Sequence, residues 1–313
     1  MFWLYAAARA GAVAFFVGLL TFLMTRSLPG DAAFRIAAGR YGYDMVNAAA
    51  ADAVRRELGL DQPAWVQLYR WMADLVQGKL GNSMVSGDPV MHEIAHQLGH
   101  TLQLSIAAWA LALLMGVVLG VVIALRPTSW LAQGLQWSAT VLRASPAFLI
   151  GVVLSLGLAV HLQWLPVAGS DHGGHLVLPA LTLALAMAAG LAQVVSHQLQ
   201  AVLRSDYFEF ALTKALPQRA ALWRHAARNI AVPVLAYSGV QLVLLVEGVV
   251  IVETMFAWPG IGHALVHAIV ARDIPMIQGT ALVMGLLFVL LNTLLDLFHQ
   301  RLDPRLLNTR SAS

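Results

Sequence analysis

The stretch LQLSIAAWALALLMGVVLGVVIAL, residues 102–125, decides the fold class, because it carries no charged side chain. An apolar run of about 20 residues is long enough to cross the hydrocarbon core of a bilayer as a helix. Five further runs of this kind follow one another along the chain, at residues 10–28, 135–160, 176–197, 232–254 and 277–298. The sequence therefore predicts an all-α membrane protein with six transmembrane helices.

The overall composition agrees with a chain that faces lipid. Of its 313 residues, 59% are hydrophobic and only 11% are charged, whereas a soluble domain usually has about 25% charged residues. The absence of cysteine excludes disulfides, thiolate metal sites and cysteine nucleophiles. The first apolar run is too long, and lacks the small-residue cleavage site, for a removable signal peptide.

A long segment of mixed polarity, residues 29–101, separates the first two apolar runs. Helical periodicity over residues 51–58, 63–77 and 90–98 predicts a small helical cap outside the membrane. The expected organisation is a first transmembrane helix (1–28), this periplasmic cap (29–101), a five-helix core with a cytoplasmic loop at 205–230 (102–301), and a cytoplasmic tail (302–313).

The orientation of the spans follows from the basic residues in the short loops, which concentrate on the cytoplasmic side of membrane proteins. With a cytoplasmic N-terminus, the opposite short loops hold only Arg272. The sequence thus predicts that both termini are cytoplasmic. The basic residues on the same side are Arg9, Arg126, Arg204, Lys214, Arg219, Arg224, Arg228, Arg301, Arg305 and Arg310.

The cytoplasmic loop SDYFEFALTKALPQRAALWRHAARNIAVP, residues 205–233, has the pattern of two short helices. Asp206 followed by Glu209 predicts a capping box at a helix start, and Pro217 suits the first turn of a second helix. A basic, amphipathic hairpin of this kind either docks into a groove on a partner protein or is an ordinary loop that maintains topology.

Several motifs together resemble one protein family. Glu209-Phe210-Ala211, followed by Ala215 and Pro233, resembles the coupling motif of ABC-importer permeases, with Phe210 and Ala215 in place of the usual Ala and Gly. Further blocks resemble the dipeptide, oligopeptide and nickel branch and occur in the family's order over almost the whole chain: LPGD (28–31), LGLDQP (58–63), LPxxG (165–169), RHAARN (224–229), ETMFAWPGIG (253–262), RDIP (272–275) and LDPR (302–305).

The resemblance implies partners and a set of contact residues. The partners would be a second homologous permease in a heterodimer, two cytoplasmic ATP-binding subunits that use ATP and Mg²⁺, and a periplasmic solute-binding protein. This chain would bind no cofactor and would not be an enzyme. Residues implied in coupling to the ATPases are Glu209, Phe210, Ala211, Ala215, Leu216, Arg219, Arg224 and Arg228.

The sequence around the two lysines agrees with ATP hydrolysis by a separate subunit. A phosphate-binding P-loop needs Gly-Lys followed by Ser or Thr. Lys79 is followed by Leu80, and Lys214 is preceded by Thr213, so neither belongs to such a loop.

Two carboxylates lie within the fifth apolar run or at its end, and acidic groups in a membrane usually face a partner or a water-filled path. We expect Glu247 to line the solute path, with an interhelical hydrogen bond as the alternative. Glu253 is the second path candidate, but its place in a family motif favours a structural role for it, bracing residues 256–262.

The sequence His92-Glu93-Ile94-Ala95-His96 matches the zinc-metalloprotease pattern, which makes an intramembrane protease an alternative function. The motif lies in the cap, and no third-ligand motif follows in a later span, so we disfavour this alternative. An ion-coupled secondary transporter is disfavoured because the chain lacks internal inverted symmetry.

Other histidines extend this pattern. The pairs His92/His96, His96/His100 and His263/His267 have the spacing that presents two imidazoles on one helix face. They form either a polar solvated face or a transient entry site for a transition-metal ion. Together with Glu247, they shift the expected solute slightly towards nickel or a metal chelate; a peptide-specific permease remains the alternative.

Overall fold

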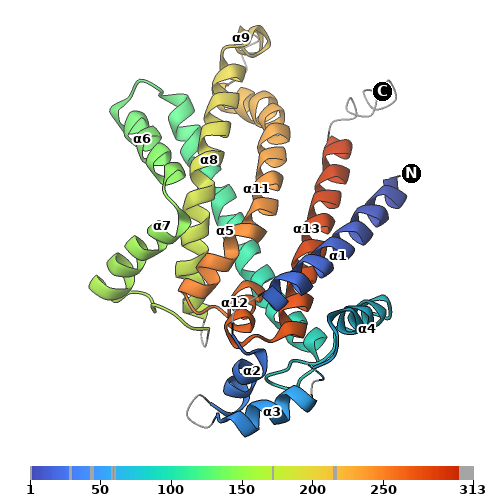
Figure 1. The fold of residues 1–313 in the computed structure, drawn as a ribbon. Coiled ribbons are helices and arrows are strands. Elements are labelled where there is room, and N and C mark those ends of the chain that lie inside the picture. Colours follow the sequence, from blue (N-terminus) through green and yellow to red (C-terminus); the bar gives the residue numbers. More distant parts are fainter. Residues whose placement is uncertain are drawn as a thin grey trace. The chain divides into compact units, whose positions relative to one another are not determined.

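The computed structural model describes residues 2–27, 30–42, 46–57, 59, 61–170, 173–213 and 217–302. These residues form helices and connecting loops without a β-sheet, which confirms the predicted all-α class (Figure 1). Within them, five helices are long and apolar enough to cross a membrane, and a bent pair of helices makes a sixth span if it is counted as one.

Contacts divide the chain into two units that do not follow the sequence order. Unit 1 combines the chain up to Thr101 with Pro259–Leu291, and unit 2 combines Leu102–Trp258 with the chain from Asn292. The helices α5 (Val90–Leu125) and α13 (Ile274–Leu302) run through both units. The segment predicted as a separate cap therefore packs with a part of the chain that follows it by more than 150 positions.

Unit 1 contains the predicted cap helices and one that the sequence analysis missed. Its elements are α1 (Phe2–Ser27), α2 (Ala32–Tyr41), α3 (Ala48–Glu57), α4 (Ala64–Val76), the start of α5, α12 (Ile261–Ala271) and most of α13. The helix α2 was missed because its apolar residues give it only weak amphipathic periodicity. Its clearest signal is Asp31, which caps it by accepting a hydrogen bond from the Ala33 N–H at 2.9 Å. The helix expected at 90–98 continues unbroken into the second span as a 36-residue helix.

A buried polar network joins distant motifs within unit 1. Asp273 is 3% exposed, and its carboxylate accepts hydrogen bonds from the Ser83 hydroxyl and from the N–H groups of Met84 (3.1 Å) and Met276 (3.3 Å). It therefore caps α13 and holds the loop before α5. The adjacent Arg272, at φ 55°, donates from Nη1 to the Gly30 carbonyl at 2.8 Å. The RDIP motif thus gathers the loops of unit 1.

Unit 2 is built around α8 (Val177–Leu203), which packs against α6 (Trp130–Ala144), α7 (Ala147–Leu154) and α11 (Arg228–Met255) (Figure 1). A π-helical turn, η2 (Ser155–His161), prolongs α7, and the 3₁₀ turn η3 (Gly173–Leu176) leads into α8. Between α8 and α11 lie α9 (Asp206–Thr213), α10 (Gln218–Ala221) and the π-helical turn η4 (Leu222–Ala227).

The third predicted span, at residues 135–160, is a bent pair of helices and not one continuous helix. The helices α6 and α7 meet at Ser145–Pro146 and are bent by 114°. Ser145 is extended (φ −86°, ψ 133°) because the proline ring disfavours a helical conformation at the residue before it. Pro146 also lacks the N–H that would continue the helical hydrogen bonds. On α6, Arg143 donates to the Gln193 side chain of α8 at 2.7 Å.

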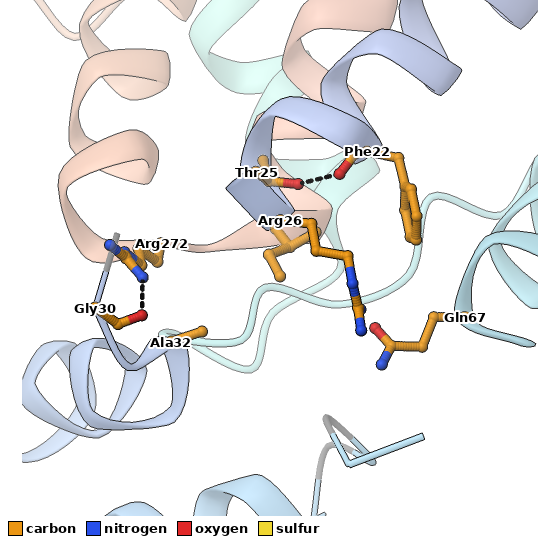
Figure 2. A pocket seen from close by; sticks show the side chains of 8 residues that line it. Phe22, Thr25, Arg26, Gly30, Ala32, Gln67 and Arg272 are labelled. Atoms are coloured by element: carbon orange, nitrogen blue, oxygen red, sulfur yellow. Dashed lines mark hydrogen bonds between the residues drawn. The ribbon is translucent and has the colours of Figure 1, made fainter. Parts of the chain in front are cut away.

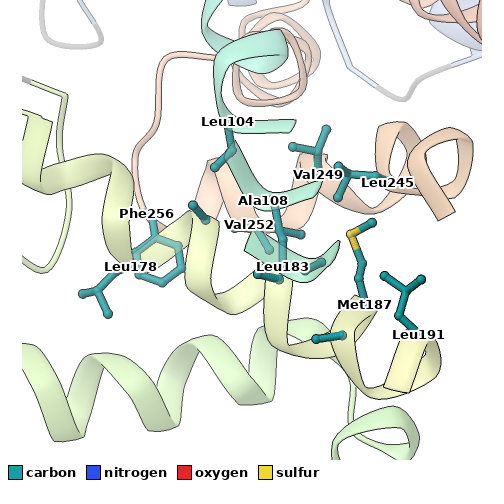
Figure 3. Close-up of a cluster of buried hydrophobic side chains, with 14 of the residues drawn as sticks. Leu104, Ala108, Leu178, Leu183, Met187, Leu191, Leu245, Val249, Val252 and Phe256 are labelled. Carbon is teal, nitrogen blue, oxygen red and sulfur yellow. The ribbon is translucent and has the colours of Figure 1, made fainter. Parts of the chain in front are cut away.

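The core of unit 2 is apolar and closely packed. Figure 3 shows side chains from α5, α8 and α11 meeting in one cluster, among them Leu104, Leu191, Val249 and Phe256, each 2% exposed or less. A Cβ added at Gly120 of α5 would lie 2.6 Å from the Val195 Cβ and 2.7 Å from the Ala192 carbonyl oxygen. This glycine therefore permits the close approach of α5 and α8.

The glycine contact can be tested with a single methyl group. We expect Gly120→Ala to destabilise the protein by about 1–3 kcal/mol, because the new Cβ overlaps α8. Gly99→Ala, on the same helix with no atom within 4 Å of the added Cβ, is the matched control and should be neutral or stabilising through helix propensity. Thermal unfolding of the detergent-purified proteins measures both, and equal midpoints would contradict the close-packing argument.

The Asp273 network gives a second prediction. Asp273→Ala leaves the Ser83 hydroxyl and the Met84 N–H without their buried acceptor, so we expect a loss of about 3 kcal/mol. The control is Asp88→Ala, since this carboxylate is exposed. Limited proteolysis at the loop of residues 81–89 should accelerate in the first variant only. Unchanged proteolysis and an unchanged melting temperature would show that the network is dispensable.

Candidate coupling surface and solute path

The short helix α9 carries the first predicted coupling residues. It begins at Asp206, where the N–H groups of Phe208 and Glu209 donate to the Ser205 carbonyl at 3.0 and 3.2 Å. The helix therefore starts one residue earlier than a capping box with Asp206 as cap would require. Both acidic residues lie in the first turn instead, where a negative charge is favourable beside the helix dipole.

Two contacts anchor α9 to its neighbours in unit 2. Phe208 is 3% exposed and packs in a cluster with residues from α5, α8 and the start of the α10–α11 segment, namely Ala124, Leu199, Ala221 and Ala226. On the adjacent position, the Tyr207 hydroxyl accepts a hydrogen bond from Asn229 Nδ2 of α11 at 3.1 Å. These contacts attach α9 to α8 and α11.

Large aromatic side chains near the anchored helix are exposed. Phe210 is 60% exposed and Trp223 of η4 is 81% exposed. Exposed aromatic side chains of this size are typical of a protein-binding surface, and Glu209, which precedes Phe210 in sequence, is exposed as well. The sequence analysis missed Trp223, although an aromatic residue inside a basic loop was the available signal.

The structure describes the other predicted coupling residues to different extents. Arg228 is exposed at the start of α11. Ala211 has helical backbone in α9, Arg219 in α10 and Arg224 in η4; for these three, only the backbone is described. Ala215 and Leu216 lie outside the described residues.

The predicted second helix of the loop differs from the expectation of a separate hairpin arm. Its first turn follows Pro217 as expected, with the Ala221 N–H bonded to the Pro217 carbonyl at 3.0 Å. It then continues through α10 and η4 directly into α11, with Pro233 inside the long helix. A π-helical turn adds a residue to one turn and is common at functional sites.

The predicted path carboxylates are both on α11. Glu253 is fully buried, and its carbonyl accepts a hydrogen bond from the Trp258 N–H at 2.8 Å. The residues that follow α11 are also held by the loop before η3, because the Gly169 N–H donates to the Phe256 carbonyl at 3.0 Å. This burial fits the bracing role better than a path-lining one. Glu247 lies in the same helix, where only its backbone is described.

Two of the three predicted histidine pairs have neighbouring rings in unit 1. The ring centroids of His96 and His100 are 4.9 Å apart, and those of His263 and His267 are 4.5 Å apart. Burial, and secondarily the nearby His267, lowers the pKa of His263 and favours its neutral form. No group of three or more His, Cys, Asp or Glu side chains that could hold a metal occurs in the described part of the chain.

The protease-like motif has a structural explanation. His92, Glu93 and His96 lie in the first turns of α5, where His92 and His96 are exposed and Ile94 between them is buried. The Glu93 carboxylate accepts a hydrogen bond from the Ser86 hydroxyl at 2.5 Å, so it fixes the loop that enters the helix. The spacing therefore reflects an amphipathic helix start.

Known proteins resemble this chain over nearly its entire length. Residues 116–308 match the family described as binding-protein-dependent transport system inner membrane component, and residues 2–107 match the N-terminal region of such membrane components. Among curated relatives, the glutathione transport system permease protein GsiC of Pectobacterium atrosepticum is 37% identical over 289 residues, covering 92% of each chain. GsiC of Escherichia coli K12 is 36% identical over 290 residues, covering 93% of each chain.

A third relative is a Brucella suis protein that carries the provisional name of a peptide transport system permease protein; it is 38% identical over 306 residues, covering 95% of this chain and 96% of the relative. These names concern glutathione and peptides, so the preference for nickel drawn from the histidines finds no support in them. The protease alternative is wrong, because the matched family consists of transport subunits and not enzymes.

The apolar spans, the anchored exposed helix and the family matches over both halves of the chain agree with one another. They place the protein in the inner membrane as a multi-pass component that works with a solute-binding protein and ATPase subunits. The chain belongs to the binding-protein-dependent transport system inner membrane component family, the permease subunits of ABC importers.

Proposed function

We propose that this permease forms the membrane path for short peptides or peptide-like solutes delivered by its binding protein. The observation that carries the proposal is the similarity, over more than nine-tenths of both chains, to permeases named for glutathione and peptide transport. The lack of a three-donor metal group among the described residues supports a peptide over a nickel ion.

The proposed assembly pairs this chain with a second, homologous permease and with two ATP-binding subunits that use ATP and Mg²⁺. Both termini and α9 lie on the cytoplasmic side in this proposal, and the cap faces the periplasm. The basic residues of the short loops support this orientation, because they gather on the side of α9. The resident cofactors of the machine then belong to the ATP-binding subunits.

Coupling in this proposal is a two-state process. The exposed side chains Glu209, Phe210 and Trp223 contact an ATP-binding subunit, and the arginines of the loop surround the contact. When nucleotide binding moves that subunit, α9 moves with it, and the buried Phe208 carries the motion to α8 and α11. ATP favours one state of the spans only to the extent that it binds that state more tightly.

The solute path in this proposal runs along α11, with Glu247 facing it. A carboxylate at bilayer depth is costly unless it meets water or a partner, and a wide hydrated path supplies the water. Glu253 braces the turn after α11 and does not touch solute, in keeping with its complete burial.

The docking role of α9 can be tested by removing one aromatic ring. Because Phe210 is 60% exposed, Phe210→Ala should leave the fold intact. Loss of a central aromatic contact of about 2 kcal/mol should weaken binding to the ATP-binding subunits about 30-fold. Pull-down and surface-binding measurements on the purified subunits give the affinity.

Trp130→Ala serves as the matched control, since this side chain is 84% exposed at the start of α6, outside α9. It should bind the ATP-binding subunits normally. Full affinity and full solute-stimulated ATP hydrolysis in Phe210→Ala would overturn the assignment of α9 as the docking element.

The solute class can be tested with the complete transporter in proteoliposomes. We expect ATP-dependent accumulation of a labelled short peptide or glutathione, driven by the cognate binding protein and unaffected by a chelator that removes transition-metal ions but leaves Mg²⁺ for the ATP-binding subunits. The triple change His92→Asn, His96→Asn and His100→Asn should leave this uptake unchanged, because two of the three imidazoles are exposed and no larger donor group surrounds them. Nickel accumulation that fails in the triple variant would refute the peptide proposal.

A further inference from the structure

A small cavity in unit 1 lies where α1 ends. Its volume is about 130 Å³, and it is enclosed by the last turns of α1, the start of α2, one residue of α4 and the turn before α13. The lining residues are Phe22, Thr25, Arg26, Gly30, Ala32, Gln67, Arg272 and Ile274. Figure 2 shows the Arg26 guanidinium and the Gln67 amide facing each other beside this space.

The lining carries two positive charges and no carboxylate. Arg26 is exposed and makes no hydrogen bond or ion pair with the residues that the structure describes. Arg272 is 9% exposed, and its Nη1 bond to the Gly30 carbonyl fixes its guanidinium at the wall of the cavity. The nearest carboxylate in sequence, Asp31, is already engaged by the Ala33 N–H and, at 2.5 Å, by Arg55.

The remaining lining suits a ligand with an apolar part. Phe22 is 8% exposed, and its ring, with Ala32 and Ile274, forms a non-polar side of the cavity. Gln67 donates to the Gln62 carbonyl at 2.9 Å, which holds its amide in place and leaves its side-chain oxygen towards the cavity. A guanidinium group favours a planar or tetrahedral oxyanion such as carboxylate or phosphate, and the Arg26 guanidinium lies beside Gln67, apart from that of Arg272.

The position of the cavity in the chain indicates the source of the anion. Arg26 is in the last turn of α1, whose apolar span covers Leu4–Ser27, so the cavity opens where this helix leaves the hydrocarbon. The neighbouring α4 is amphipathic and exposes Trp65 (72%) and Tyr69 (73%), one turn apart. Exposed Trp and Tyr concentrate at the headgroup level of a bilayer, where an amphipathic helix lies in the interface.

We propose that this cavity is a binding site for the phosphate group of an anionic phospholipid. Arg26 holds the phosphate, Gln67 beside it contacts the polar headgroup, and Phe22 with Ile274 contacts the first carbons of the acyl chain. Arg272, bonded to Gly30, adds a positive charge at another part of the wall. The site joins the end of α1 to α4 through a lipid and is independent of the solute that the transporter carries.

The test uses the full chain in its assembled transporter, purified in detergent, with phosphatidylglycerol as the added lipid. Native mass spectrometry counts bound lipid, and thermal unfolding follows stabilisation as the lipid is titrated. We expect saturable binding of phosphatidylglycerol, with Arg26→Gln weakening it about tenfold or more, because a charge-assisted hydrogen bond contributes at least about 1.5 kcal/mol. The matched control is Arg70→Gln, an exposed arginine of α4 that does not line the cavity.

Competition distinguishes a lipid from a small anion. Inorganic phosphate and glycerol phosphate, which lack acyl chains, should not displace the bound phosphatidylglycerol at millimolar concentration. Displacement by either compound would assign the cavity to small anions and overturn the lipid site. Equal weakening by Arg26→Gln and Arg70→Gln would also overturn it, because it would show a general attraction of basic side chains to lipid.

Discussion

A peptide group in the hydrocarbon of a bilayer has no water to bond with, and the architecture of this protein depends on that constraint. Every long apolar run is consequently helical, since only a helix satisfies its own backbone within one segment. Between helices there is little hydrophobic driving force in lipid, so close packing has to hold them together. The glycine contacts of α5 with α8 serve this purpose in unit 2.

Polar residues of the motifs satisfy the same constraint at the helix ends by bonding free backbone groups. A helix end leaves unsatisfied N–H and carbonyl groups, and each must find a partner. Asp273 caps α13, and the Thr101 hydroxyl accepts a hydrogen bond from the Ile261 N–H at 2.8 Å at the start of α12. The motifs RDIP and ETMFAWPGIG thus have a structural role at helix ends. This role accounts for polar residues that could be mistaken for catalytic ones.

The region around α9 combines rigidity with exposure. Phe208 fixes one side of α9 in a buried cluster, whereas Phe210 of the same helix is 60% exposed. The coupling role proposed for α9 requires both properties: firm attachment to the spans and an exposed surface for the ATP-binding subunit. Along the chain, the π-helical turn η4 lies between α9 and α11.

The sequence by itself determined the all-α class, the approximate limits of the apolar spans and the family, because hydropathy and motif order are local properties of the chain. The pair Ser145-Pro146 is also a local signal for a helix break. The apolar residues on both sides of it, however, indicated one continuous span. Only the tertiary structure decided that Gly30, Ser83 and Arg272–Asp273 meet, that Glu253 is buried and that the described histidines do not join a metal-binding group of three or more donors. Those outcomes depend on contacts between residues far apart in sequence, and no spacing along the chain specifies which distant loops come together to satisfy a buried carboxylate.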